Sequence, residues 1–206
     1  MKVKEVHSIL LNKLNFTQDA LYKLDAFSKE VIEYNKKFNL ISKSTVENIW
    51  DRHILDSAQL VKFIEFKDGS NLSDLGSGAG FPGIVLAIFN RNPKFHVKLY
   101  EKSRVKSKFL VLLCKKLNIR ADVYGDNYNL HEINSNYVVS RAFKNLEEHI
   151  RISREIIKVN HKLIILKGKS AEEEIKKLNK NLNYSYSLEK SITDSKSKIL
   201  IIEIKK

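Results

Sequence analysis

The sequence predicts an α/β fold with a mainly parallel sheet, preceded by a small helical region. From about residue 70 onward, short apolar segments of strand length alternate with longer amphipathic segments, as expected of consecutive β–α–β units. The first 69 residues instead carry apolar side chains at steps of three and four, which indicate helices. A chain of 206 residues with 43% hydrophobic content suits one domain of ordinary size with a small appendage.

The helical region is expected to form a cap over residues 1–69. Thr45, followed by acidic and amide side chains, is expected to mark the start of its last helix. The apolar stripes that predict the helices contain Leu10, Leu11, Leu14, Leu21, Leu24, Phe27, Val31, Tyr34, Ile49, Trp50, Ile54, Ala58 and Val61.

Residues 70–206 are expected to form the sheet domain. Its last two strands are separated by little more than a turn, so they predict an antiparallel pair at one end of the sheet. The expected order is strand 71–75, helix 82–90, strand 95–100, helix 104–117, strand 121–124, strand 137–140, helix 146–158, strand 162–167, helix 171–180, and strands 183–188 and 198–204.

A glycine-rich run, Asp-Leu-Gly-Ser-Gly-Ala-Gly-Phe-Pro-Gly at residues 74–83, lies between the first strand and the first helix of this domain. It holds four of the seven glycines and one of the two prolines. Glycines let a backbone approach a ligand closely, and a helix N-terminus presents free N–H groups. Pro82 suits the first helical position, where its missing N–H would be unpaired anyway. The run predicts a loop that holds a nucleotide-like cofactor.

The spacing within this loop fits two classes of cofactor. Gly78, Gly80 and Gly83 match the dinucleotide fingerprint of NAD and FAD proteins. Read from Asp74, the pattern Asp-x-Gly-x-Gly-x-Gly is typical of S-adenosylmethionine loops, and an acid there attracts a sulfonium but repels a pyrophosphate. Glu101, at the end of the next strand, suits a ribose diol in either case. The additional acid and glycine favour S-adenosylmethionine.

The charge distribution points to an anionic partner such as nucleic acid. The net charge of +13 is concentrated after residue 70, since residues 1–70 carry only +1 and residues 71–206 carry +12. Residues 91–120 contain ten basic side chains and a single acid. This segment predicts a polyanion-facing surface, with a merely solvated lysine face as the alternative.

Other features indicate a cytoplasmic protein without a membrane span. The sequence has no apolar run near the ~18 residues that a transmembrane helix needs, and its N-terminus lacks a signal-peptide apolar block. The single cysteine, Cys114, excludes an internal disulfide and a cysteine-based zinc site. We expect no metal, and a monomer is the simplest expectation.

Five segments carry a resemblance to a known family. The sequence resembles the bacterial small-subunit rRNA guanine-N7 methyltransferases, also called glucose-inhibited division protein B or RsmG, from about residue 30 to the C-terminus. The resemblance implies a Rossmann-like methyltransferase domain, S-adenosylmethionine, and methylation of N7 on one guanine of 16S rRNA, position 527 in the usual rRNA numbering. The segments are Asn39-Leu40-Ile41-Ser42, Arg52-His53-Ile54-Leu55-Asp56-Ser57, Phe81-Pro82-Gly83, Ser140-Arg141-Ala142-Phe143 and Leu166-Lys167-Gly168.

By position, the resemblance implies that Gly76, Phe81, Gly125, Asp126 and Arg141 contact the cofactor. One segment departs from the family pattern, because 125–127 reads Gly-Asp-Asn where an Arg-x-Glu sequence is usual. The carboxylate of Asp126 could still accept a hydrogen bond from the adenine amino group.

The residue types also narrow the chemistry. Cys114 lies in the apolar run 109–114, so we expect it to pack in the core rather than attack cytosine C5. Neither Pro82 nor Pro93 is followed by a second proline, so the Asp/Asn-Pro-Pro-aromatic loop of adenine-N6 enzymes is absent. Guanine N7 presents a lone pair and needs no general base, so catalysis can rest on proximity and orientation.

No catalytic residue is therefore assigned, although Arg141 and His53 are candidates. Arg141 ends a strand, at the edge where open α/β sheets bind ligands, and is expected to contact the cofactor or the phosphates and guanine beside it. The alternative is a surface arginine. His53 and Asp56 share a helix face, so His53 either takes part in catalysis or rRNA contact, or is held by a carboxylate while packing the cap onto the sheet.

Two other functions stay open on the sequence. A non-catalytic rRNA-binding protein of the same fold is supported only by the altered segment 125–127. An NAD-dependent oxidoreductase would need a substrate domain, for which only the N-terminal helices are available.

Overall fold

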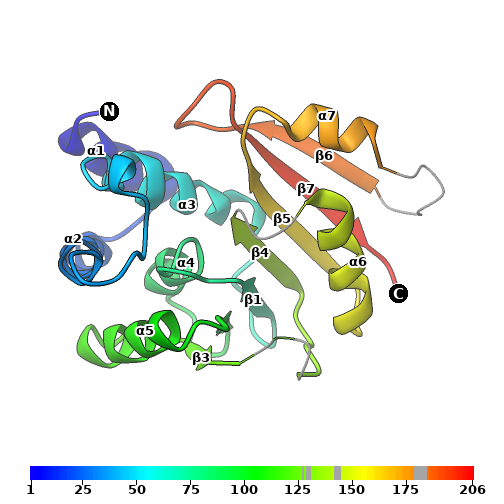
Figure 1. Ribbon diagram of the computed structural model, residues 1–206, viewed down its shortest axis with the longest axis horizontal. Coiled ribbons are helices and arrows are strands. Elements are labelled where there is room, and N and C mark those ends of the chain that lie inside the picture. The colour runs from blue at the N-terminus through cyan, green and yellow to red at the C-terminus, as the bar shows by residue number, and fades with distance from the viewer. Residues whose placement is uncertain (127, 129–130, 142–144, 179–184) are drawn as a thin grey trace.

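The computed structural model describes residues 1–126, 128, 131–141, 145–178 and 185–206. Its centre is a seven-stranded sheet in the order β3-β2-β1-β4-β5-β7-β6 (Figure 1). Neighbouring strands from β3 to β5 run parallel, whereas β7 is antiparallel to both β5 and β6. The strands are β1 Asn71–Leu75, β2 His96–Tyr100, β3 Asp122–Tyr124, β4 Tyr137–Arg141, β5 His161–Lys167, β6 Ser185–Lys190 and β7 Lys198–Ile204.

The predicted mainly parallel sheet with an antiparallel C-terminal pair is confirmed. The observed strands begin and end within two residues of the predicted ones, as is usual for element boundaries. The strand order reverses between β1 and β4, because the chain continues from β1 to β2 on one side and from β4 to β5 on the other. In open α/β sheets this switch point is where ligands bind.

Helices cover both faces of the sheet, because alternate residues of the buried strands face two separate cores. Leu72, Val139 and Ile164 face a core shared with the N-terminal helices. Their strand neighbours Leu75 and Val138 face the second core. The first face carries α1 Val3–Leu14, α2 Gln18–Asn35, α4 Gly83–Phe89 and α5 Arg104–Lys116, and the second carries α6 Leu146–Ile156 and α7 Ala171–Lys176 (Figure 1).

The last part of the N-terminal region is an irregular helix. It comprises η1 Lys43–Thr45, η2 Trp50–Leu55, α3 Asp56–Ala58 and η3 Gln59–Phe63. The sequence predicts a regular helix from Thr45, but this residue lies in a single 3₁₀ turn, and η2 has π-helical hydrogen bonding. Such π segments are frequent at functional sites, and this one contains Arg52 and His53.

Within the ranges that the structure describes, none of the helices combines the length and the apolar content needed to span a bilayer.

Candidate functional site at the carboxyl edge of the sheet

The glycine loop turns sharply as it leaves β1 and stays attached to the end of β2. The amides of Gly76 and Ser77 donate to the carbonyl oxygen of Tyr100 at 2.9 and 3.1 Å. Gly76, Gly78 and Gly80 have φ angles of 74°, 58° and 99°, in the region that L side chains rarely adopt. The three glycines therefore allow a turn at the switch point between β1 and β4.

Gly83, the first residue of α4, is required by close packing. A Cβ atom there would overlap the side chain of Leu99 and lie 2.6 Å from Oδ2 of Asp74. Pro82, where the sequence predicts the helix to begin, lies one position before it and caps it. The loop and α4 can thus lie directly against β1 and β2.

Asp74 anchors the start of α4. Its Oδ2 accepts a hydrogen bond from the amide of Gly83 at 2.9 Å, and its side chain is fully buried. Burial raises the pKa of Asp74 to about 7, against the opposing effect of the Gly83 hydrogen bond. Oδ1 is also buried and has no hydrogen-bond partner among the described residues. The carboxylate expected to attract a cationic ligand therefore also holds the loop and the helix together.

Glu101 connects the loop to β2. Its Oε2 accepts from the amide of Gly78 at 2.8 Å, and its Oε1 accepts from the amide of Ser103 at 2.7 Å. The side chain is buried at the carboxyl end of β2. It thus lies beside the loop, where the sequence predicts a ribose-binding acid.

Phe81 joins the loop to the N-terminal helices. Its buried ring lies 4.9 Å, centroid to centroid, from both Phe27 and His53, and the guanidinium of Arg141 lies 5.3 Å from its centroid. The side chain therefore packs into the cap, and Phe81 can face a cofactor in the loop chiefly through its backbone.

Arg141 and His53 form a hydrogen-bonded pair between β4 and η2. Nη2 of Arg141 lies 2.6 Å from Nδ1 of His53, and Nη1 donates to the carbonyl of Arg52 at 3.1 Å. Since a guanidinium can only donate, Nδ1 accepts and the ring proton is on Nε2, which donates to Oγ1 of Thr45 at 2.8 Å. Both ring nitrogens are engaged within the protein.

Burial also determines the charge of this pair. Burial lowers the pKa of His53 to about 3, with further lowering by the cations Arg141 and Arg52. His53 is therefore neutral near pH 7 and accepts from the arginine. The pKa of Arg141 is lowered by burial, and the negative charges of Asp56 and Asp74 oppose that shift.

Asp56 does not hold His53, contrary to one of the two interpretations of the sequence. Its Oδ1 instead accepts from Nε2 of Gln59 and from Oγ1 of Thr193, both at 2.9 Å. Arg52 reaches the same loop, with Nη1 at 3.3 Å from Oδ2 of Asp194. The loop between β6 and β7 thus binds the irregular helix through Thr193 and Asp194. No local pattern in the sequence indicates these contacts, because Asp56 and Thr193 are 137 positions apart.

Asp126 lies beyond β3, and His131 supports it. Nε2 of His131 is 2.6 Å from Oδ1 of Asp126. The imidazole meets the rings of Tyr124 and Tyr100 edge-on at 4.9 and 5.4 Å, and these two rings stack at 4.8 Å. Sequence reasoning did not find this aromatic group, although both tyrosines end strands at the ligand-binding edge. Asn127, Ala142 and Phe143 of the sequence motifs lie outside the described residues.

Gly125 packs closely against α5, since a Cβ atom there would lie 3.1 Å from Oγ of Ser107. Cys114 is buried in the same helix, and burial raises the pKa of its thiol to about 11. It packs in the core, as the sequence predicts.

In the described part of the chain, no group of three or more His, Cys, Asp or Glu side chains could hold a metal ion.

The residues present fit S-adenosylmethionine. In front of the loop there is open space, because the nearest atom to a Cβ built on Gly78 is the carbonyl oxygen of Gly76 at 3.8 Å. Carboxylates follow β2 at Glu101 and β3 at Asp126, and these two strands are neighbours. Such groups can accept hydrogen bonds from a ribose diol and an adenine amino group.

Comparison with solved structures defines the fold of the protein. A structure described as a SAM dependent methyltransferase from Aquifex aeolicus superposes with a TM-score of 0.59 and 15% sequence identity, covering 82% of this chain and 97% of that one. At that identity the likeness concerns the fold. With the glycine loop at the switch point, it shows that the protein has the Rossmann-like fold found in S-adenosylmethionine-dependent methyltransferases.

Sequence comparison then identifies the family. A family model described as GidB, rRNA small subunit methyltransferase G, matches residues 20–202. The protein named "Ribosomal RNA small subunit methyltransferase G" in Pelagibacter ubique is 34% identical over 199 residues, covering 94% of this chain and 93% of that one. Its namesake in Rickettsia prowazekii is 38% identical over 184 residues, covering 89% and 94%.

The chain belongs to the rRNA small subunit methyltransferase G family. The family, the enzyme class and the cofactor predicted from the sequence are confirmed. Neither the oxidoreductase nor the non-catalytic alternative is favoured.

Proposed function

We propose that this protein transfers a methyl group from S-adenosylmethionine to N7 of a guanine in 16S rRNA, at position 527 in the usual rRNA numbering. The observation that carries the proposal is the loop of Gly76, Gly78 and Gly80 at the switch point, flanked by Glu101 and Arg141. The names of the relatives support small-subunit rRNA as the substrate.

The cofactor site in this proposal spans the carboxyl ends of four strands. Gly76, Gly78, Gly80 and the backbone of Phe81 face the cofactor, and Glu101 binds its ribose. Gly125 and Asp126 form the adenine end, where His131 and the two tyrosines orient the carboxylate. Arg141 borders the site on the side of β4.

The reaction needs little acid–base chemistry from the chain. S-adenosylmethionine supplies an electrophilic methyl group on a sulfonium. The N7 lone pair would accept this group as the C–S bond breaks, so the chain would have no proton to remove from N7 and the positive charge would pass to the guanine. Arg141 can only donate, so its proposed role is to position the guanine or its phosphates. His53 has both ring nitrogens engaged, so its proposed role is to orient Arg141.

The surroundings suit a large anionic substrate. In this proposal residues 1–69 form a cap and residues 70–206 the methyltransferase domain of a cytoplasmic monomer. Lys102, Arg104, Lys108, Lys115 and Arg120 are exposed and form no salt bridge with a described residue. They provide a surface for the phosphate backbone.

The proposal is tested by methyl transfer from labelled cofactor to small-subunit rRNA, followed by mapping of N7-methylguanine. We expect one modified guanine with the wild-type protein and none with Gly76→Asp, because the aspartate side chain is strained at φ 74° and faces the cofactor. Tight rRNA binding without transfer would instead support the non-catalytic alternative. Modification at another atom or nucleotide would contradict the proposed specificity.

A further inference from the structure

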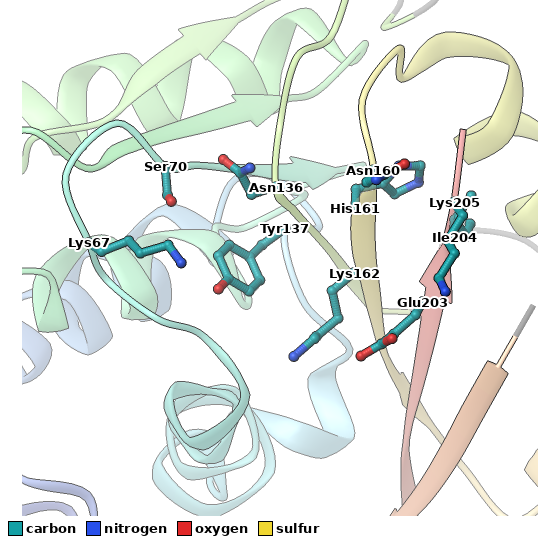
Figure 2. Close-up of a pocket in the computed structure, with 10 residues that line it drawn as sticks. All are labelled: Lys67, Ser70, Asn136, Tyr137, Asn160, His161, Lys162, Glu203, Ile204 and Lys205. Carbon is teal, nitrogen blue, oxygen red and sulfur yellow. The ribbon is translucent and has the colours of Figure 1, made fainter.

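A cavity lies at the edge of the sheet that is opposite the glycine loop. Figure 2 shows the side chains that line it. It has a volume of about 320 Å³ and is formed where β4 and β5 begin and β7 ends. Tyr137 begins β4 and Arg141 ends it, so four strand steps of ~3.3 Å place this cavity roughly 13 Å from the methyl-transfer edge. It is therefore separate from the proposed cofactor site.

The cavity is positively charged. Lys67, Lys162 and Lys205 line it, against a single acid, Glu203. Lys67 is paired at 2.9 Å with Glu65, which lies outside the lining. Lys162 and Lys205 form no salt bridge with any residue that the structure describes. Two ammonium groups are thus available to an anion.

Neutral hydrogen-bond donors add to these charges. The hydroxyl of Tyr137 accepts from the amide of Glu65 at 3.1 Å, which leaves its own proton free to donate. Ser70 is 4% exposed and makes no side-chain hydrogen bond with a described residue. In Figure 2 the side-chain ends of Lys67, Tyr137 and Lys162 point toward one shared space.

We propose that this cavity binds a phosphate group. A phosphate carries negative charge and mainly acceptor oxygens at neutral pH. These match the two ammonium groups and the hydroxyl donors of the lining, which outnumber its one carboxylate, Glu203. Lys162 and Lys205 supply the charge, and Tyr137 and Ser70 supply directional hydrogen bonds. The phosphate can belong either to the rRNA backbone or to a free nucleotide, and these sources can be distinguished by experiment.

The first experiment titrates inorganic phosphate into the full-length protein at constant ionic strength and follows backbone amide signals by NMR. We expect saturable shifts confined to residues 70, 136–137, 160–162 and 203–205. The double variant Lys162→Gln/Lys205→Gln should bind at least about tenfold more weakly, since a hydrogen bond to a charged group is large on that scale. Glu203→Gln, which removes the only acid of the lining, should bind about two- to fivefold more tightly.

The matched control is Lys4→Gln/Lys13→Gln, which removes the same charge from exposed positions on α1. It should bind phosphate as the wild-type protein does. Absence of saturable shifts, or equal shifts in the Lys162/Lys205 variant, would overturn the proposal. Because this experiment requires neither S-adenosylmethionine nor methyl transfer, it can fail or succeed independently of the proposed function.

The second experiment identifies the source of the phosphate. For rRNA binding, the slope of log affinity against log salt should become shallower in the Lys162/Lys205 variant than in the α1 control. The expected difference is roughly 0.7 for each rRNA phosphate that the removed lysines neutralise. That result assigns the site to the rRNA backbone. Equal slopes in the two variants, together with phosphate binding in the first experiment, assign it to a free nucleotide phosphate.

Discussion

Removal from solvent shifts the pKa of three ionisable side chains near the glycine loop, namely the buried Asp74 and His53 and the half-buried Arg141. Burial raises the pKa of Asp74 to about 7 and lowers that of His53 to about 3. Burial also lowers the pKa of Arg141, whose guanidinium donates to His53. The neutral histidine accepts the hydrogen bond that orients the arginine.

Replacing Asp74 by asparagine should change the pH dependence of stability. The folded pKa of about 7 lies above the ordinary value of 3.8, so the wild-type fold loses stability as pH rises from about 4 to 7. Asparagine keeps an acceptor for the Gly83 amide but carries no charge. We therefore expect the melting temperature of the variant, relative to wild type, to be higher at pH 8 than at pH 5.

Asp19→Asn, at an exposed position in the first turn of α2, is the control and should show no such change. An equal offset of the Asp74→Asn variant at both pH values would contradict the assigned role of burial.

Replacing His53 by glutamine should reduce sensitivity to acid. The folded pKa of His53, about 3, lies below the ordinary value of 6.5. Between these two pH values the imidazole is protonated in the unfolded chain and neutral in the folded protein. Stability is fully present above pH 6.5 and is lost as pH falls toward 3. The variant should lose less of its free energy of unfolding between pH 7 and pH 5, measured by urea denaturation. The exposed His96 provides the control His96→Gln, and parallel losses in all three proteins would refute the prediction.

At the scale of elements, the junction of β1, the glycine loop and α4 depends on the close approach of the α4 backbone to β1 and β2. The amide of Gly83 donates to Asp74, and the Gly83 backbone lies against Leu99 of β2. The loop amides of Gly76 and Ser77 hold the same strand end through Tyr100. Backbone groups therefore form the edge of the proposed cofactor site, and side chains in place of the glycines would occupy the space next to it.

Gly83→Ala should destabilise the protein by about 1–3 kcal/mol, because the added Cβ atom would overlap the side chains of Leu99 and Asp74. The higher helix propensity of alanine offsets at most about 1 kcal/mol of that cost. It should also weaken binding of S-adenosylhomocysteine, measured by calorimetry. Gly168→Ala is the matched control, since a Cβ atom there has no neighbour within 4 Å, and it should change stability by no more than about 0.5 kcal/mol. Equal stability of both variants would show that the junction can relax.

At the scale of the whole molecule, contacts far apart in the sequence hold the N-terminal helices to the sheet. Arg141 at the end of β4 binds η2, and Thr193 in the loop after β6 binds Asp56 of α3. Burial raises the pKa of Asp56, and the Thr193 hydrogen bond opposes that shift. The helical region, β4 and the β6–β7 loop therefore meet on the β4 side of the proposed cofactor site.

Thr193→Val should loosen this arrangement. It removes a hydroxyl donor from the partly buried carboxylate of Asp56, at a cost of about 1–3 kcal/mol. Amide hydrogen exchange should speed up in residues 52–59 and 191–197 together, because the two segments share the hydrogen bond. Ser195→Ala changes an exposed hydroxyl in the same loop and should leave exchange unaltered. Faster exchange in only one segment would contradict the coupling.

The sequence by itself determined the order of strands and helices along the chain, the position of the glycine loop and the family. These depend on patterns within a few residues: alternation in the strands, steps of three and four in the helices, and the spacing of Gly76, Gly78 and Gly80. Local chemistry suffices for them, because φ preferences and amphipathic faces act over one turn or one strand.

Only the tertiary structure decided which polar side chains meet. His53 pairs with Arg141 across 88 positions of the sequence, and Thr193 donates to Asp56 across 137 positions. The π-helical form of η2 depends on its packing against the sheet. The cavity around Lys162 likewise brings together residues before β1, β4 and β5. Burial then sets their charges, since the pKa of a side chain depends on how much water and which neighbours surround it.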